Sequence, residues 1–277
     1  MIQTLIILLV VVGSTAAILL RPAFIRWYRN RLKHRPFSSL WRAVIERTLP
    51  MYEKLSLDER KRLQGHIQVF LAEKQFIGCA GLQVTEEMKI TISAIACLLL
   101  LNERGQYFPK LRSILVYPTA YIVNETTFVE NSIVEERREA RLGESWSADQ
   151  VVLAWSTVKQ DTLYWTDGHN VVLHEFAHQL DQEDGRAEGV PILPSHADYA
   201  IWKQVMTQSY HQLCQDIERG GKTVMDRYGT TNPAEFFAVA TETFFEKPRR
   251  LLTQHPTLYE QLRRYYQLDP VQWMGRQ

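Results

Sequence analysis

The stretch Val171-Val172-Leu173-His174-Glu175-Phe176-Ala177-His178-Gln179-Leu180 is the most informative part of this 277-residue chain. Two histidines four residues apart project from one face of a helix, and the glutamate between them can reach a ligand that both histidines bind. Neutral imidazoles suit zinc, and this HExxH spacing on an apolar helix is typical of metallopeptidases. We therefore predict that His174 and His178 bind zinc and that Glu175 is the general base of a hydrolase.

A third protein ligand must lie elsewhere, because catalytic zinc usually takes three protein ligands and keeps one open position. The nearest acidic candidates are Asp181, Glu183 and Asp184. Asp184 falls where the longer motif HExxHxxGxxH places its last ligand, but that motif needs a glycine at the position of Asp181. The short spacing is therefore disfavoured.

Glu235 is the better candidate for the third ligand. Asn232-Pro233 is a helix start, and Glu235 falls in the first turn of a helix predicted to run to about Phe245. That helix is so apolar that a carboxylate on it needs a charged partner, which zinc would supply. Two alternatives stay open: Glu235 as a capping-box residue, and Glu242 either as the ligand or as a carboxylate that supports a ligand histidine.

The first residues of the chain predict a membrane anchor. Ile2 to Leu20 is an uncharged run of 19 residues, and as a helix it would measure about 28 Å, close to the hydrocarbon thickness of a bilayer. The small residues from Gly13 to Ala17 leave a cleaved signal peptide as the alternative. That alternative is disfavoured because the basic residues follow the apolar run instead of preceding it: Arg21, Arg26, Arg29, Arg31, Lys33 and Arg35.

The same basic residues predict the orientation of the anchor. No acidic residue occurs before Glu46, so the positive-inside rule places the chain after residue 20 in the cytoplasm. Trp27 and Tyr28 would lie at the level of the lipid headgroups. We predict a transmembrane anchor over residues 1–20, a basic juxtamembrane linker over 21–40 and a metallopeptidase domain over 41–277. The protein would be a single-pass protein of the inner (cytoplasmic) membrane, with its catalytic domain facing the cytoplasm.

The remaining pattern predicts an α+β fold, mainly helical, with a small mixed sheet. Apolar residues recur at helical spacing from Trp41 to Gln75, and Thr85 can cap a helix that runs to about Leu101. This second helix is better explained as a buried core helix than as another membrane span, because it is too short to cross comfortably. The C-terminal stretch Leu258 to Tyr266 predicts an amphipathic helix packed on the core.

Short β-branched and aromatic runs predict the strands, which are 114–117, 121–123 and 151–158. The charged stretch Glu135 to Ser147 between them is predicted to be a loop. Such a sheet followed by the HExxH helix is the plan of a zincin, in which an edge strand binds the substrate through backbone hydrogen bonds. We assign that role to Ala154–Val158, with a purely structural strand as the alternative.

Composition narrows the possible partners. Hydrophobic residues make up 45% and charged residues 23% of the chain, which is enough for a large globular core. A net charge of +1 gives no reason to expect nucleic-acid binding, since phosphate recognition needs a concentrated basic field. Cys79, Cys97 and Cys214 are too far apart to form a CxxC zinc motif, and they suggest no disulfide framework.

The motif and a downstream segment together resemble the Mlc titration factor A family of bacterial zinc peptidases. The resemblance is carried by His174 to Asp181 and by Asp226-Arg227-Tyr228-Gly229 followed by Asn232-Pro233-Ala234-Glu235-Phe236-Phe237. More distantly, the spacing of Tyr228 and Glu235 is similar to that in the catalytic domain of anthrax lethal factor. The resemblance implies that His174, His178 and Glu235 are the zinc ligands, that Glu175 is the base, and that Tyr228 stabilises the tetrahedral intermediate.

The resemblance also implies two kinds of function. The first is a zinc peptidase, aminopeptidase-like in its action on peptide or protein substrates. The second is a regulatory binding protein that sequesters a transcriptional repressor of sugar uptake, with catalysis secondary. A zinc protein without catalysis is disfavoured because Glu175 is intact. The apolar start of the chain departs from this resemblance, because the family is typified by a soluble cytoplasmic protein, so membrane attachment is inferred from hydropathy alone.

Overall fold

A small sheet and a group of helices enclose the HExxH helix. The computed structural model describes residues 2–102, 106–119, 121–129, 133–141, 143–147 and 149–273. The α-helices are α1 (Ile2–Lys33), α2 (Ser39–Thr48), α3 (Leu57–Glu73), α4 (Glu86–Leu98), α5 (Trp155–Asp161), α6 (Val171–Asp181), α7 (His196–Glu218), α8 (Pro233–Glu246), α9 (Pro248–Gln254) and α10 (Pro256–Tyr266). The strands are β1 (Gln75–Gly78), β2 (Ser113–Tyr117), β3 (Tyr121–Val129), β4 (Ile133–Arg141), β5 (Gly143–Ser147) and β6 (Gln150–Ala154), and short 3-10 helices are η1 (Tyr52–Lys54), η2 (Gln182–Asp184), η3 (Arg227–Thr230) and η4 (Pro270–Trp273).

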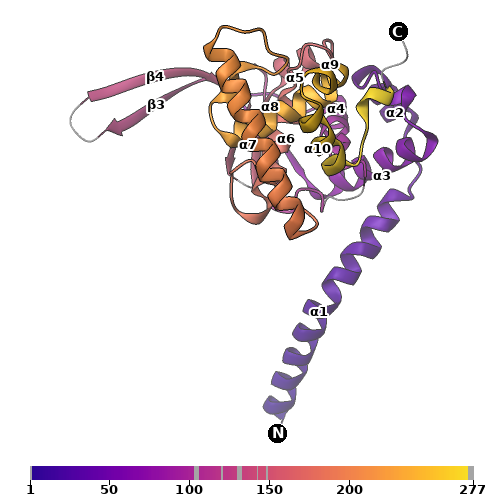
Figure 1. Ribbon diagram of the computed structural model, residues 1–277. Coiled ribbons are helices and arrows are strands. Elements are labelled where there is room, and N and C mark those ends of the chain that lie inside the picture. Colours follow the sequence, from indigo (N-terminus) through magenta and orange to yellow (C-terminus); the bar gives the residue numbers. More distant parts are fainter. Residues whose placement is uncertain are drawn as a thin grey trace.

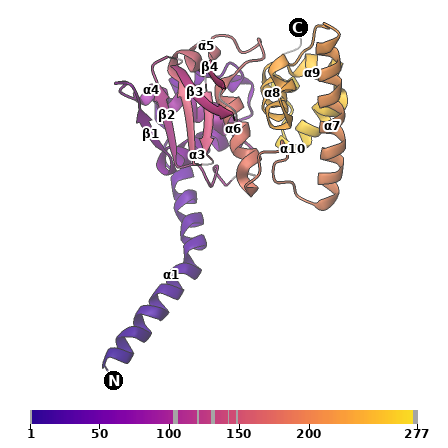
Figure 2. The same cartoon turned by 90° about the vertical axis from the view of Figure 1, so that its left-hand side faces the viewer.

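The main sheet is mixed, with the strand order β1-β2-β6-β5. Strands β1, β2 and β6 run parallel, and β5 pairs antiparallel with β6. Strands β3 and β4 form a separate two-stranded hairpin that projects from the body of the molecule (Figure 1). Helix α6 lies between this sheet and the group formed by α7, α8, α9 and α10 (Figure 2). The predicted fold, mainly helical with a small sheet, is confirmed.

The predicted strand 151–158 is wrong in its second half. Strand β6 ends at Ala154, and residues from Trp155 onward form helix α5. The cause is the partner strand: Tyr117 pairs with Ala154 and is followed by Pro118, which cannot continue the ladder. The Pro118 carbonyl instead accepts a hydrogen bond from the Ser156 amide at 3.1 Å. Residues 154–158 therefore form no edge strand, and the edge of the sheet next to β6 is β5.

The predicted loop Glu135–Ser147 is also wrong. Its residues belong to strands β4 and β5, except Leu142, which lies outside the described residues. Charged residues are compatible with this hairpin because β4 pairs with β3 in a separate two-stranded sheet, where Glu125 lies opposite Arg137. Strand β1 was not predicted either, because the helical pattern was extended to Gln75, which is the first residue of β1.

The core forms where α4 and α6 meet the sheet. From Ile92 to Leu98 every side chain of α4 is fully buried, so α4 is the predicted core helix. Phe176, in the middle of the HExxH motif, packs edge-on against Phe108 with ring centroids 4.8 Å apart, and Phe70 lies on the same cluster. The predicted Thr85 cap is present, with its hydroxyl accepting from the Met88 amide. The face of α6 that carries Phe176 is thus fixed by aromatic packing.

Helix α1 is a single unbroken helix that leaves the body of the molecule (Figures 1 and 2). Its segment Val10–Lys33 is long and apolar enough to cross a membrane, and its apolar 18-residue window has a mean hydropathy of 1.3 and no buried residue. Among the described residues this is one candidate span. Residues 21–33, expected as a linker, continue the same helix. The division into anchor, linker and catalytic domain remains a prediction.

Candidate metal centre

Asn170 caps the amino end of the HExxH helix α6. Asn170 is fully buried, and its side-chain oxygen accepts a hydrogen bond from the Leu173 amide at 3.1 Å. Such a cap satisfies an amide that the first turn of a helix leaves without a partner. One turn later His174 points away from the aromatic cluster, and His178 follows on the same face, with side chains only 14% and 10% exposed. The two imidazoles therefore meet in a largely dry site.

Three ligand atoms come together as a triangle. The Nε2 atoms of His174 and His178 are 3.2 Å apart, and Oε2 of Glu235 lies 3.0 Å from the first and 3.3 Å from the second. A tetrahedral zinc ion with bonds of about 2.0–2.1 Å has ligand atoms about 3.3 Å apart. The three atoms therefore fit zinc with little movement.

The first turn of α8 places Glu235 without using its carboxylate. Asn232 caps α8 by accepting a hydrogen bond from the Glu235 amide at 3.0 Å. The predicted capping position is thus real, but it engages the backbone of Glu235. Its carboxylate faces the two histidines, so Glu235 serves the cap and the site at once.

Glu242 supports His174 and does not join the triangle. Its Oε1 lies 2.7 Å from Nδ1 of His174, and its Oε2 accepts the Asn170 amide at 2.6 Å. A carboxylate that accepts Nδ1–H leaves the Nε2 lone pair free for a metal ion. Glu246, one turn further along α8, accepts hydrogen bonds from the Gly168 amide and from the side chain of Asn170. Glu235, Glu242 and Glu246 therefore face the start of the HExxH helix together.

The electrostatics of the site favour positive charge. Burial favours the neutral form of Glu235, but the hydrogen bonds from His174 and His178 outweigh this effect and lower the pKa of Glu235 to about 2. Burial also opposes charge on His174, yet the nearby Glu242 and Glu235 raise its pKa well above the usual value. A cation between these groups would replace the protons that they attract.

Glu175 has the environment of a general base beside such a cation. Its side chain is 4% exposed, and its Oε2 accepts no hydrogen bond from any residue that the structure describes. A buried carboxylate oxygen without a partner is costly, so it needs a ligand that the protein itself does not provide. Burial raises the pKa of Glu175 above its usual value, which makes it a better proton acceptor when it is ionised.

Tyr228 lies at the rim of the site, on η3. Its ring centroid is 5.9 Å from that of His174, and the side chain is half-exposed. Asp226 holds this turn by accepting the Tyr228 amide at 2.7 Å. His169, the other histidine near the motif, lies 3.6 Å from Asp226 and outside the ligand triangle.

The nearby acidic candidates have other roles. Asp181 is 1% exposed, and its two oxygens accept the amides of Gly189 and Val190 at 2.9 and 2.6 Å. Gly189 has φ +73° and lies so close to Pro233 that a Cβ there would approach the Pro233 carbonyl oxygen to 2.3 Å. Asp181 thus fixes the loop against the start of α8. Asp184 is exposed and accepts the Arg186 amide.

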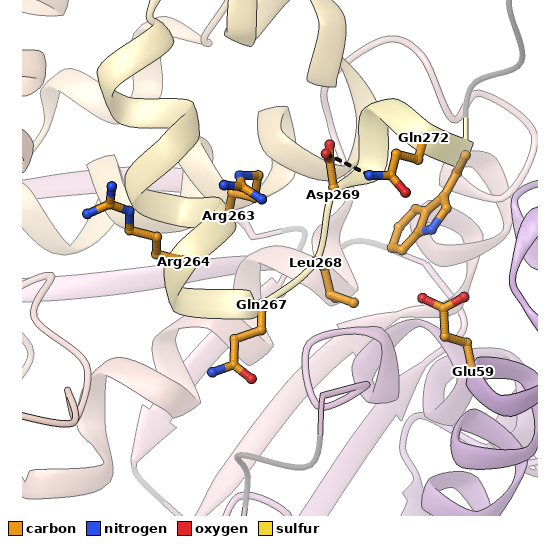
Figure 3. Close-up of a pocket in the computed structure, with 8 residues that line it drawn as sticks. Glu59, Arg263, Arg264, Gln267, Leu268, Asp269 and Gln272 are labelled. Carbon is orange, nitrogen blue, oxygen red and sulfur yellow. Dashed lines mark hydrogen bonds between the residues drawn. The ribbon is translucent and has the colours of Figure 1, made fainter.

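A polar cavity of about 630 Å³ lies away from this centre, between α10, η4 and the first turn of α3 (Figure 3). Within it Gln272 donates to Asp269 at 3.1 Å. Its two arginines, Arg263 and Arg264, are both paired with Glu260. None of the predicted site residues lines it, so the cavity has no part in the predicted chemistry.

Comparison with known proteins agrees with this geometry. Residues 24–267 match the family model described as glucose-regulated metallo-peptidase M90. The chain belongs to the M90 family of metallopeptidases. This confirms the resemblance to Mlc titration factor A: the protein of that name from Klebsiella pneumoniae (strain 342) is 31% identical over 81% of this chain and 84% of its own length. The one from Enterobacter sp. (strain 638) is 30% identical over the same shares.

A further relative extends beyond the M90 match. A Synechocystis protein named uncharacterized protein slr2042 is 44% identical over 98% of this chain and 99% of its own length. The M90 match begins at residue 24, so most of the apolar part of α1 lies outside it. Membership of the M90 family implies a metal ion, for which His174, His178 and Glu235 form a possible site.

Three residues that hold the start of α6 in place were not predicted from the sequence. Asp161 accepts the Val171 amide at 2.8 Å, and Asn170 and Glu246 complete the hydrogen bonds around the start of α6. Asn170 could have been found, since an asparagine directly before an apolar helical run is typical of a cap. The sequence around Asp161 did not indicate this role, because Asp161 reaches Val171 only through the turn between α5 and α6.

Proposed function

We propose that this chain is a zinc-dependent peptidase of zincin type, in which His174, His178 and Glu235 hold the metal and Glu175 is the general base. The observation that carries the proposal is the triangle of ligand atoms 3.0–3.3 Å apart, together with the buried Glu175 oxygen that has no hydrogen-bond partner among the described residues. Zinc bound there would acidify water and polarise a peptide carbonyl.

The residues of the chain divide the remaining work. Glu175 accepts a proton from the attacking water and returns it to the leaving amine. Tyr228, at the rim, donates a hydrogen bond to the oxygen on which negative charge develops. Glu242 keeps the proton of His174 on Nδ1. Each role uses an atom that already faces the metal site or lies at its edge.

Strand β5 is our candidate for substrate binding, in place of residues 154–158. It is the edge of the sheet, it pairs with β6 on one side, and it lies against α6. An extended peptide that adds to the open side of β5 would run past the HExxH helix. We further propose an aminopeptidase-like preference, which rests on the family resemblance.

Location and partner complete the proposal. Helix α1 would anchor the protein in the inner membrane, with the metal site in the cytoplasm, because the basic residues follow the apolar run. The name Mlc titration factor A, borne by several relatives, favours a second function: binding of an Mlc-like transcriptional repressor. That function does not require hydrolysis.

The substitution Glu175→Gln tests the catalytic part. The variant should retain zinc and lose hydrolysis of peptides, because the amide keeps the shape of the carboxylate but accepts no proton. Glu87→Gln is the matched control, since Glu87 is exposed and forms a surface salt bridge with Arg47. Peptides with a free or an acetylated amino terminus separate aminopeptidase from endopeptidase action. Full hydrolysis by the pure Glu175→Gln protein would refute the proposal, and repressor binding by that variant would separate the two functions.

A further inference from the structure

Helix α1 carries an aromatic and basic belt just before it meets the catalytic domain. Phe24, Trp27 and Tyr28 are exposed, at 62%, 54% and 37%. The Phe24 ring lies 5.7 Å from that of Trp27 and 6.5 Å from that of Tyr28, so the three form one cluster. The guanidinium of Arg31 lies 5.7 Å from the Trp27 ring. Exposed aromatic rings mixed with arginine are typical of the headgroup layer of a bilayer.

The next turn of α1 is already bound to the domain. Leu32 is 3% exposed. Arg29 makes two hydrogen bonds to Glu73, at 2.6 and 2.8 Å, and its guanidinium lies 4.9 Å from the Tyr107 ring. The stem of Lys33 lies so close to Gly65 that a Cβ there would approach it to 3.2 Å. The end of α1 therefore packs against α3 and Tyr107.

The aromatic belt and the residues that contact the domain are too close along α1 for a flexible spacer between them. The distance along the helix from Trp27 to Leu32 is about 7.5 Å, at about 1.5 Å per residue. The headgroup layer on one side of a bilayer is about 5–7 Å thick. If Trp27 lies among the headgroups, Leu32 and the domain that buries it begin where that layer ends.

The contacts of α1 also define which part of the domain faces the membrane. Arg29, nearer to the membrane, contacts Glu73, and Lys33, further away, contacts Gly65. Helix α3 therefore runs antiparallel to α1, with its carboxyl end pointing toward the lipid. Arg29 also donates to the Gln106 carbonyl oxygen at 3.4 Å. Ala72, Gln75 and Gln106 are exposed at this end.

We infer that the catalytic domain lies directly on an anionic lipid surface, with α1 inserted in the bilayer and the Ala72, Gln75 and Gln106 end of the domain against the headgroups. The inference rests on the membrane part of the proposed function and does not depend on hydrolysis. It confines the active site to the membrane surface, so its substrates would be peptide segments that reach that surface. Both views show α1 leaving the domain beside α3, and Figure 2 shows that it bends on its way to the N-terminus. Pro22 lies inside α1, and a proline inside a helix removes a backbone hydrogen bond and bends it.

Photo-crosslinking of the full chain in liposomes tests this arrangement. The probes are phosphatidylglycerol and phosphatidylcholine that carry a photoreactive group in the headgroup, and crosslinked peptides are identified by mass spectrometry. We expect adducts on residues 24–31 and on Ala72, Gln75 and Gln106, with a larger yield from the anionic probe. Leu57 is the internal control, because it is 72% exposed and apolar but lies at the far end of α3.

A charge reversal in the Arg29–Glu73 pair tests whether this contact holds the domain against the membrane. Glu73→Lys should repel Arg29, so the adducts on Ala72, Gln75 and Gln106 should be lost while those on α1 remain; Glu87→Lys should change neither set. Adducts confined to α1 in the native protein, or equally frequent at Leu57, would overturn the inference, as would equal yields from both lipids. Hydrolysis measured in detergent reports separately on the peptidase proposal.

Discussion

The support that Glu242 gives to His174 leads to a quantitative prediction. In the native site Oε1 of Glu242 pairs with Nδ1 of His174 at 2.7 Å, and Oε2 accepts the Asn170 amide at 2.6 Å. The substitution Glu242→Gln keeps the size of the side chain but replaces one acceptor oxygen by an NH₂ group. Only one of the two buried donors can then be satisfied.

The size of the effect can be estimated in two ways. A buried donor without an acceptor costs about 1–3 kcal/mol. Loss of a partner that orients a ligand histidine weakens metal binding by about 10–100-fold, which corresponds to about 1.4–2.7 kcal/mol. The two estimates agree, so Glu242→Gln should raise the dissociation constant for zinc by about one to two orders of magnitude.

Competition with a chelating dye measures this constant on the metal-free chain in detergent. Glu246→Gln is the matched control: Glu246 is also buried, one turn further along α8, but its oxygens accept from Gly168 and Asn170 and, among the described residues, from no histidine. It should lower the stability of the fold and leave zinc affinity nearly unchanged. Equal weakening of zinc binding by both variants, or none by Glu242→Gln, would refute the reasoning.

Three other predictions follow from the same geometry. Tyr228→Phe should lower kcat for peptide hydrolysis by about 100–1000-fold with unchanged zinc content. Steady-state kinetics and metal analysis measure both quantities, and a change in KM alone would contradict the prediction. Gly189→Ala should lower the free energy of unfolding more than Gly81→Ala, because both have positive φ but only Gly189 has a carbonyl 2.3 Å from the new Cβ; equal losses in urea unfolding would exclude the steric explanation. Burial raises the pKa of Asp161 from 3.8 to about 7, so its proton makes the metal-free chain more stable at low pH, and this contribution is lost as the pH rises from about 4 to about 7. Asp161→Asn should remove this slope, at most about 1.4 kcal/mol per pH unit, and an unchanged pH profile of unfolding would count against it.

Much of the site could be predicted because its parts are local. The four-residue spacing of His174 and His178 fixes their common face on any helix. Asn232-Pro233 marks the start of α8, so the position of Glu235 in its first turn was also readable. The sequence left open whether the Glu235 carboxylate caps its own helix or joins the two histidines of α6. That choice depends on how α8 packs against α6.

The strands were predicted less well for a physical reason. A run such as Val151 to Val158 has the composition of a strand throughout, but a strand persists only where a neighbour supplies hydrogen bonds. Pro118 ends the neighbour, and the run becomes helix α5 after Ala154. The opposite error occurred at Glu135–Ser147, where charged residues were assigned to a loop although most of them pair in strands.

The amino-acid sequence by itself determined the metallopeptidase motif, the caps of its helices and the apolar start of the chain, because each depends on residues within one or two helical turns. Only the tertiary structure decided the partners of these parts. In it the Glu235 carboxylate faces the two histidines, Glu242 pairs with His174, and the end of α1 contacts α3. These contacts join residues 44 to 68 positions apart, and packing of whole helices, which no local pattern encodes, brings them within hydrogen-bonding distance.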